Sequence, residues 1–239
     1  MINLASSSVS DLFTIPAAEW TVINKRVGQV LATTNIKDYI SSLLAGYPNL
    51  LSSCEQWQSS TFSGLILHSK VLSDYATQAT SNFNGLNEQV KEVIESGSQN
   101  LSDSLKQEII HLLQKLSTDT APIAAQSNQL STAVLNFLNF NVTVDAQMAS
   151  YKGTLDTFWK PLGDNINQLE TAAGHVTGTW SAIIDDLNFV LTQPIIVTIP
   201  FLQSLNIDGA ILSWQNIQKE SLGFPALTAG QQQYWTNPF

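Results

Sequence analysis

The chain is poor in charge, and most of the charge that it has is acidic. Its 239 residues include 10 lysines and arginines against 19 aspartates and glutamates, so the net charge is −9, and Arg26 is the only arginine. Charged residues make up 12% of the chain, which is about half the usual share of roughly 25%. Because affinity for a phosphate backbone comes from clustered cations, this composition argues against a nucleic-acid partner.

The residues that most often ligate metals or act as nucleophiles are also scarce. The single cysteine, Cys54, cannot form an intramolecular disulfide, and it falls on an apolar helical face with no base implied nearby. The three histidines, His68, His111 and His175, are far apart, and none has a second histidine or cysteine at zinc-ligand spacing. We therefore expect no bound metal and no cofactor.

Motifs for phosphate binding, hydrolysis and metalloprotease chemistry are missing as well. The chain contains no GxGxxG, Walker, HExxH or GxSxG pattern. Asp185 and Asp186 form the only paired carboxylate, but neighbouring positions on a helix point about 100° apart, so a solvated face explains them better. We expect no enzymatic activity and no small-molecule substrate. An enzyme whose site combines distant histidines and carboxylates stays a third hypothesis, after the two that are given at the end of this section.

Signals for export and for membrane insertion are weak. Residues 1–11 have no basic region followed by an apolar run, which predicts that there is no Sec signal peptide and that the protein is soluble, either cytoplasmic in the producing cell or released by another route. The uncharged stretches 120–144 and 187–207 are interrupted by amides and prolines, so neither predicts a membrane-spanning helix.

One short run concentrates apolar side chains between two prolines. At nine residues it is too short to span a bilayer, so a buried connector or extended segment is the first interpretation. A membrane-touching or partner-binding tip is the alternative, and its candidate contact residues are Pro194, Ile195, Ile196, Val197, Ile199, Pro200, Phe201 and Leu202.

Apolar spacing is helical nearly everywhere. Helices are predicted at about 16–33, 36–43, 49–95, 101–116, 130–137, 144–190 and 202–222. The heptad spacing of Leu65, Leu72, Ala79, Leu86 and Val93 indicates supercoiled packing of the 49–95 helix.

Prolines and glycines predict where these helices end or bend. We expect a break or kink at 120–122, a kink at Pro161 within the 144–190 helix, and an end at Gly223 with Pro225. Asn100 with Asp103 is expected to cap the helix that starts near Leu101. The β-branched places where a strand could form are 142–144 and 195–199.

The sequence therefore predicts an all-α fold. We expect an elongated bundle of about five helices, two of them long and coiled-coil-like. It forms a single domain over 1–239, with short irregular termini at about 1–15 and 224–239.

Two stretches in the last third carry tryptophans in a recurring context. Residues 179–187 are TWSAIIDDL, and residues 210–217 are AILSWQNI. They resemble the C-terminal helices of α-helical pore-forming toxins, and 116–148, which includes Leu138, Phe140 and Asp145, resembles the third long helix of the same toxins. The family is the cytolysin A and haemolysin BL type, including the xenorhabdolysin-like two-component toxins. Trp180 and Trp214 also lie on the apolar stripes of their helices, so ordinary packing of a helical bundle explains them without a toxin. The resemblance marks them as the helix-packing aromatics of the family-like pattern.

The family also has a long apolar hairpin, the tongue, which enters the membrane in the pore, and this chain departs from that pattern. Only about 35 residues, amphipathic throughout, separate Asp145 from Trp180, where the family would place two helix arms and the hairpin. The resemblance then implies a non-enzymatic toxin component that associates with a companion subunit, with itself or with membrane lipid. A soluble helical scaffold or protein-interaction bundle with no membrane role is the alternative.

Overall fold

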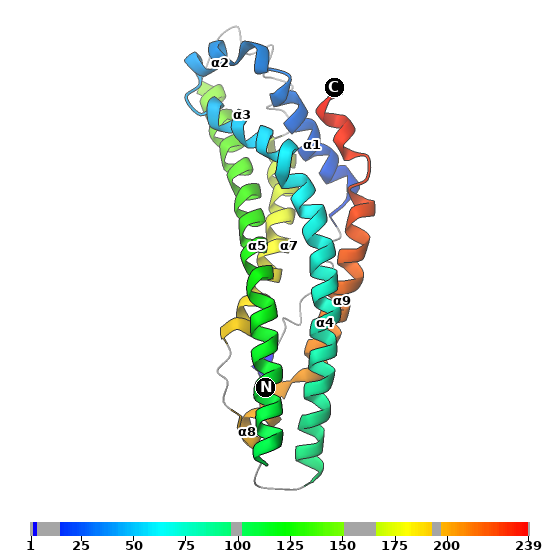
Figure 1. Ribbon diagram of the computed structural model, residues 1–239. Coiled ribbons are helices and arrows are strands. Elements are labelled where there is room, and N and C mark those ends of the chain that lie inside the picture. Colours follow the sequence, from blue (N-terminus) through cyan, green and yellow to red (C-terminus); the bar gives the residue numbers. More distant parts are fainter. Residues whose placement is uncertain (1, 4–14, 97–101, 151–165, 193–196, 239) are drawn as a thin grey trace. The chain divides into compact units, whose positions relative to one another are not determined.

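A computed structural model describes residues 2–3, 15–96, 102–150, 166–192 and 197–238. Helices account for most of these residues (Figure 1), which confirms the all-α prediction. The first long helical stretch, from Tyr47 to Glu95, comprises α3, a π-helical turn and α4, and the second is α5. The first matches the predicted 49–95 helix closely.

The elements follow one another along the chain with few extended residues. Their bounds are β1 Ile2–Asn3, α1 Ala17–Leu31, η1 Thr34–Ile36, α2 Lys37–Leu43, α3 Tyr47–Gln56, η2 Trp57–Thr61, α4 Phe62–Glu95, α5 Asp103–Ser150, α7 Ile166–Thr192, α8 Ile199–Ser204, β2 Leu205–Asn206, α9 Ile207–Leu227 and η3 Gln231–Trp235. The two strands are two residues long and pair in parallel, with Ile2 opposite Leu205.

The chain divides into two compact units. Unit 1 comprises Met1–Phe13, His68–Asn128 and Ser181–Gly223, and unit 2 comprises Thr14–Leu67, Gln129–Trp180 and Phe224–Phe239. Each unit therefore takes parts of α4 or α5 from the middle of the chain and adds segments from nearer the ends.

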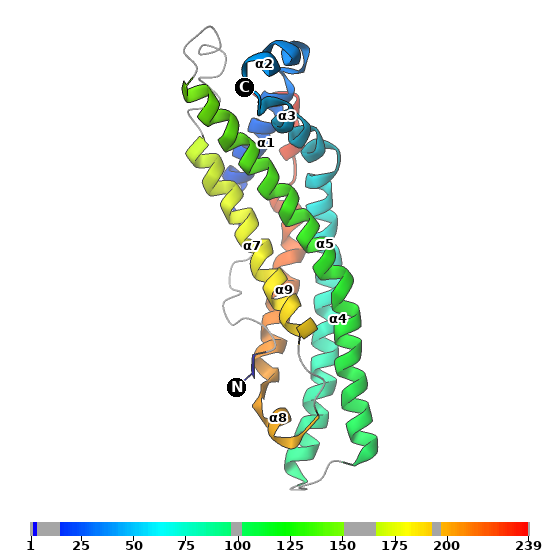
Figure 2. The ribbon, with the colours of Figure 1, turned by 90° about the vertical axis from the view of Figure 1, so that its left-hand side faces the viewer.

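Unit 1 has an apolar seam along α4. The heptad residues Leu72, Ala79 and Leu86 are fully buried, and Val93 is 4% exposed. In both ribbon views α4 and α5 lie side by side with opposite chain directions (Figures 1 and 2). The sequence repeat thus marks the buried face of α4, as an apolar heptad stripe should.

Unit 2 has an aromatic core. Its largest fully buried side chains are aromatic, namely those of Trp20, Trp57, Trp180, Tyr47, Phe62, Phe137 and Phe224. The ring of Trp20 meets Phe62 and Phe224 edge-on, with centroids 5.9 and 5.5 Å away. Such edge-to-face pairs add to the apolar burial that holds α1, the start of α4 and the end of α9 together.

The helices continue through two places where the sequence predicts that a helix could end. Pro122 lies inside α5, and the helix continues through the 120–122 stretch. Pro225 and Gly223 likewise lie inside α9, which ends only at Leu227. A proline removes one backbone hydrogen bond, but the buried side chains beside it, Ile123 in α5 and Phe224 in α9, keep the helical face packed.

The third apolar stripe is divided between two helices. Val144 and Met148 lie in α5, and the stripe positions from Leu169 to Leu187 lie in α7. All of these α7 positions are buried, as are Val144 and Met148, and they are Leu169, Ala173, Val176, Trp180, Ile183 and Leu187. The predicted kink at Pro161 and the predicted cap at Asn100 lie outside the described residues. The hydroxyl of Ser102 accepts the backbone N–H of Leu105 at the start of α5. Residues 142–144, one of the two candidate strand positions, are helical.

Candidate functional site

The Pro-flanked apolar run becomes a short helix in its described part. Thr198 caps α8, because its hydroxyl accepts the backbone N–H of Phe201 at 3.4 Å. Val197 and Leu202 are 7% and 1% exposed, Ile199 and Phe201 are half-buried, and Pro200 is exposed. Pro194, Ile195 and Ile196 lie outside the described residues. Contact between this run and a membrane or partner stays a prediction.

The two tryptophans of the toxin-like pattern are both fully buried. Trp180 belongs to α7 in unit 2, and Trp214 belongs to α9 in unit 1. The ring of Trp214 meets the ring of Tyr75 edge-on, with centroids 5.1 Å apart. Both side chains are therefore part of the packing of their helices.

The histidines and the cysteine are dispersed. His68 is buried, with Nε2 2.8 Å from the hydroxyl oxygen of Ser127, and burial lowers its pKa to about 4. His175 pairs with Glu19, and His111 is exposed. Burial raises the pKa of the Cys54 thiol to about 12, so this sulfur is not a nucleophile near neutral pH. Within the described ranges, no three metal-binding side chains gather in one place.

Besides His68 and Ser127, unit 1 has a second buried polar pair between α4 and α5. The phenol of Tyr75 lies 2.5 Å from the hydroxyl oxygen of Thr120. Because the Thr120 hydroxyl donates to the carbonyl of Leu116, Tyr75 is the donor in this pair. Burial raises the pKa of Tyr75 to about 12, so the phenol stays protonated and the pair serves packing rather than proton transfer.

Asn24 is a buried hydrogen-bonding centre in unit 2 that sequence analysis missed. Its Oδ1 accepts the indole N–H of Trp57 at 3.1 Å and that of Trp235 at 2.8 Å. Its Nδ2 donates to the backbone carbonyl of Trp20 at 2.9 Å. One side chain thus connects α1, the π-helical turn and the C-terminal 3-10 helix.

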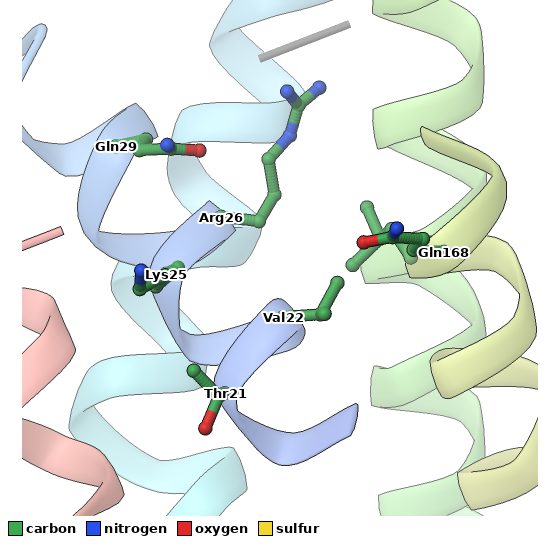
Figure 3. A pocket seen from close by; sticks show the side chains of 7 residues that line it. Thr21, Val22, Lys25, Arg26, Gln29 and Gln168 are labelled. Atoms are coloured by element: carbon green, nitrogen blue, oxygen red, sulfur yellow. The ribbon is translucent and has the colours of Figure 1, made fainter. Parts of the chain in front are cut away.

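A small polar pocket lies between α1 and α7 in unit 2 (Figure 3). It has a volume of about 220 Å³ and is lined by Thr21, Val22, Lys25, Arg26, Gln29, Gln168 and Leu169. Gln168 of α7 faces Val22 of α1 in this view. The lining amides, hydroxyl and ammonium group are suited to hydrogen bonding, and none of them is an activated nucleophile.

The guanidinium group of Arg26 is engaged with α5. Its Nε donates to Asn141 Oδ1 at 2.6 Å, and its Nη2 lies 3.0 Å from Asp145 Oδ1. The Arg26 and Asp145 side chains are 5% and 12% exposed. The only arginine of the chain therefore forms a buried ion pair, and it holds α1 against α5.

No protein-family model, no curated protein and no solved structure matches the chain. The toxin family named above therefore depends on the residues quoted from the sequence. None of the described helices combines the length and the hydrophobicity that a bilayer crossing requires.

Proposed function

We propose that the protein is a non-enzymatic component of an α-helical, cytolysin-type toxin system, which acts by associating with a companion subunit, with itself or with membrane lipid. The observation that carries the proposal is the burial of Trp180 and Trp214, on two late helices of a fold that also has two long helical stretches. The resemblance implies a tryptophan on each of two late helices, and ordinary packing of a helical bundle also accounts for their burial.

The hydrogen bonds between helices suit a protein whose helices change packing partners. Helices of unit 1 are joined by hydroxyl and imidazole pairs, such as Tyr75 with Thr120 and His68 with Ser127, and one cysteine cannot form a disulfide within the chain. Each such hydrogen bond contributes about 1 kcal/mol. Non-covalent pairs of this strength can be exchanged for similar pairs with another chain.

The apolar run from Pro194 to Leu202 is the candidate membrane contact. A net charge of −9 opposes binding to anionic bilayers, so contact would depend on apolar insertion. Val197 and Leu202 are buried. Insertion would therefore require both side chains, Val197 before α8 and Leu202 within it, to turn outward.

Flotation with neutral, anionic and sterol-containing liposomes tests the proposal, with far-UV circular dichroism to verify folding. We expect the folded protein to float with neutral or sterol-containing vesicles, or with any vesicle once a companion subunit is added. The Ile196→Asp, Phe201→Asp double variant should lose flotation and keep its helicity.

Leu212→Asp is the matched control, because Leu212 lies on α9 and is 62% exposed. This variant should float like the natural protein. A folded protein that binds neither lipid nor a companion subunit would refute the proposal. Unfolding of the double variant alone would identify the run as core.

A soluble helical scaffold is the second candidate. It is favoured because no helix among the described residues is suited to crossing a bilayer. Recovery of one defined protein complex in lipid-free buffer, unchanged by added vesicles, would support it over the toxin-like function.

A further inference from the structure

The last residues of the chain lie along α1. We call Gln231–Pro238 the C-terminal strap. Gln231 Nε2 donates to the carbonyl of Ala17 at 3.3 Å, and the indole N–H of Trp235 donates to Asn24 at 2.8 Å. Gln231 and Pro238 are buried, although the strap carries no apolar repeat of its own. The conformation of the strap is therefore fixed by its contacts with α1.

Gly28 allows the strap to approach the backbone of α1. A Cβ atom at this position would lie 2.1 Å from the carbonyl oxygen of Tyr234, which is far inside van der Waals contact. The ammonium group of Lys25 lies 5.6 Å from the centroid of the Tyr234 ring, within the range of a cation–π contact. The absence of a side chain at residue 28 is thus a condition for docking.

The surface beneath the strap is held together without it. Asn24 also accepts the indole N–H of Trp57 and donates to the carbonyl of Trp20. Phe62, which meets the ring of Trp235 edge-on at 5.5 Å, also meets Trp20 at 5.9 Å. Removing the strap would therefore leave a preformed acceptor face with its internal contacts intact.

The covalent link to the strap is short and separable from the docking contacts. Helix α9 ends at Leu227, and Thr228 donates its hydroxyl to carbonyls of the last turn. Gly230 has φ 74°, the left-handed conformation that glycine adopts readily. A change of backbone angles at 229 and 230 would turn the strap away without disturbing α9.

We propose that this acceptor face is an interaction surface for the C-terminal strap of a second copy of the chain. Two copies that exchange straps form the same contacts as two closed copies, so the exchange costs little beyond the association entropy. A short linker gives the chain's own strap an effective concentration on the order of 1 mM. Exchange is thus favoured where copies are concentrated, and it makes the self-association in the proposed function specific.

Two complementary variants test the exchange. Gly28→Ala keeps the strap and blocks the face, whereas Trp235→Ala keeps the face and removes the anchor of the strap. Each variant alone should elute as a monomer, because Gly28→Ala has no open face and Trp235→Ala has no anchored strap. The measurement is made at about 100 µM, below the effective concentration of a strap that docks in its own chain. Their equimolar mixture should form a species of twice the mass, measured by light scattering after size exclusion. A mixture that stays monomeric would overturn the proposal.

Gly178→Ala is the matched control for the added methyl group. Residue 178 is an exposed α7 position in the same unit, and its added Cβ would meet nothing within 4 Å. This variant keeps its own strap docked, so mixing it with Trp235→Ala should give no dimer. A dimer of equal yield in this control would show association through another surface and would also overturn the proposal.

A peptide measurement keeps the test decisive if Gly28→Ala does not fold. A fluorescent peptide with the sequence of residues 229–239 should bind Trp235→Ala saturably, and should bind the natural chain, whose face is occupied, at least ten-fold more weakly. Equal binding to both chains, or to neither, would contradict strap exchange. No lipid is present in these experiments, so their failure is distinguishable from a failure of the flotation test.

Discussion

Acid should destabilise the protein through His68. The imidazole is fully buried, and burial lowers its pKa from 6.5 to about 4. Between these two pH values the unfolded chain binds a proton that the folded chain does not bind. Stability therefore falls as the pH falls from about 6.5 towards 4, and above pH 7 this residue contributes no pH dependence.

The size of the effect follows from the same two pKa values. With 1.36 kcal/mol for each unit of pKa difference, lowering the pH from 7 to 5 should reduce the free energy of unfolding by about 2 kcal/mol through this residue alone. Urea denaturation followed by circular dichroism at both pH values would measure it. The variant His68→Gln, which keeps a hydrogen-bonding group and cannot be protonated, should lose this part of the pH dependence.

The control is the same substitution at His111, which is exposed on α5. His111→Gln should show the pH dependence of the natural protein, including whatever the carboxylates contribute. If His68→Gln and the natural chain lost the same free energy between pH 7 and pH 5, the burial argument would be refuted.

Three further predictions concern buried polar groups and are measured by urea denaturation unless stated. Asn24→Ala leaves two indole N–H groups without their acceptor and should destabilise the fold by about 3 kcal/mol; a loss below about 1 kcal/mol would contradict a central role. Arg26→Met removes one partner of a buried ion pair and should lower the free energy of unfolding by about 3 kcal/mol. Lys115→Met removes one partner of a more exposed pair with Asp119 and should lower it by less than about 1 kcal/mol. Equal losses in the two variants would contradict this ranking. Cys54, whose pKa is about 12, should not react with a thiol reagent at pH 8 until the protein is unfolded, and fast labelling of the folded chain would contradict its burial.

The regular part of the fold could be predicted because its signal is local. The heptad residues from Leu65 to Val93 repeat at the spacing of a helical face, and all of them are buried in α4. The errors occur where a local rule competes with packing. Pro122 and Pro225 each remove a backbone hydrogen bond, but their helices continue because neighbouring side chains are buried in the core.

The C-terminal strap could not be predicted by the same reasoning. Residues 231–235 have no apolar period, and they are ordered by Asn24 and α1, more than 200 positions earlier in the chain. One local signal was available. Gly28 interrupts an otherwise helical, partly apolar stretch, where a glycine costs about 1 kcal/mol relative to alanine, so a packing reason for it could have been sought.

The two buried polar pairs between α4 and α5 determine how far these helices can slide along each other. His68 faces Ser127, and Tyr75 faces Thr120. The two pairs are seven residues apart on each helix, and they run in opposite directions because the helices are antiparallel. A slide of one heptad would place His68 opposite Thr120, but Tyr75 opposite Leu113. The reverse slide would place Tyr75 opposite Ser127, but His68 opposite Val134. Each of these one-heptad slides would therefore place one polar ring against an aliphatic side chain, at a cost of about 1 to 3 kcal/mol. An apolar heptad repeat alone is similar after a shift of seven residues, so these two polar rings favour the observed alignment of α4 with α5.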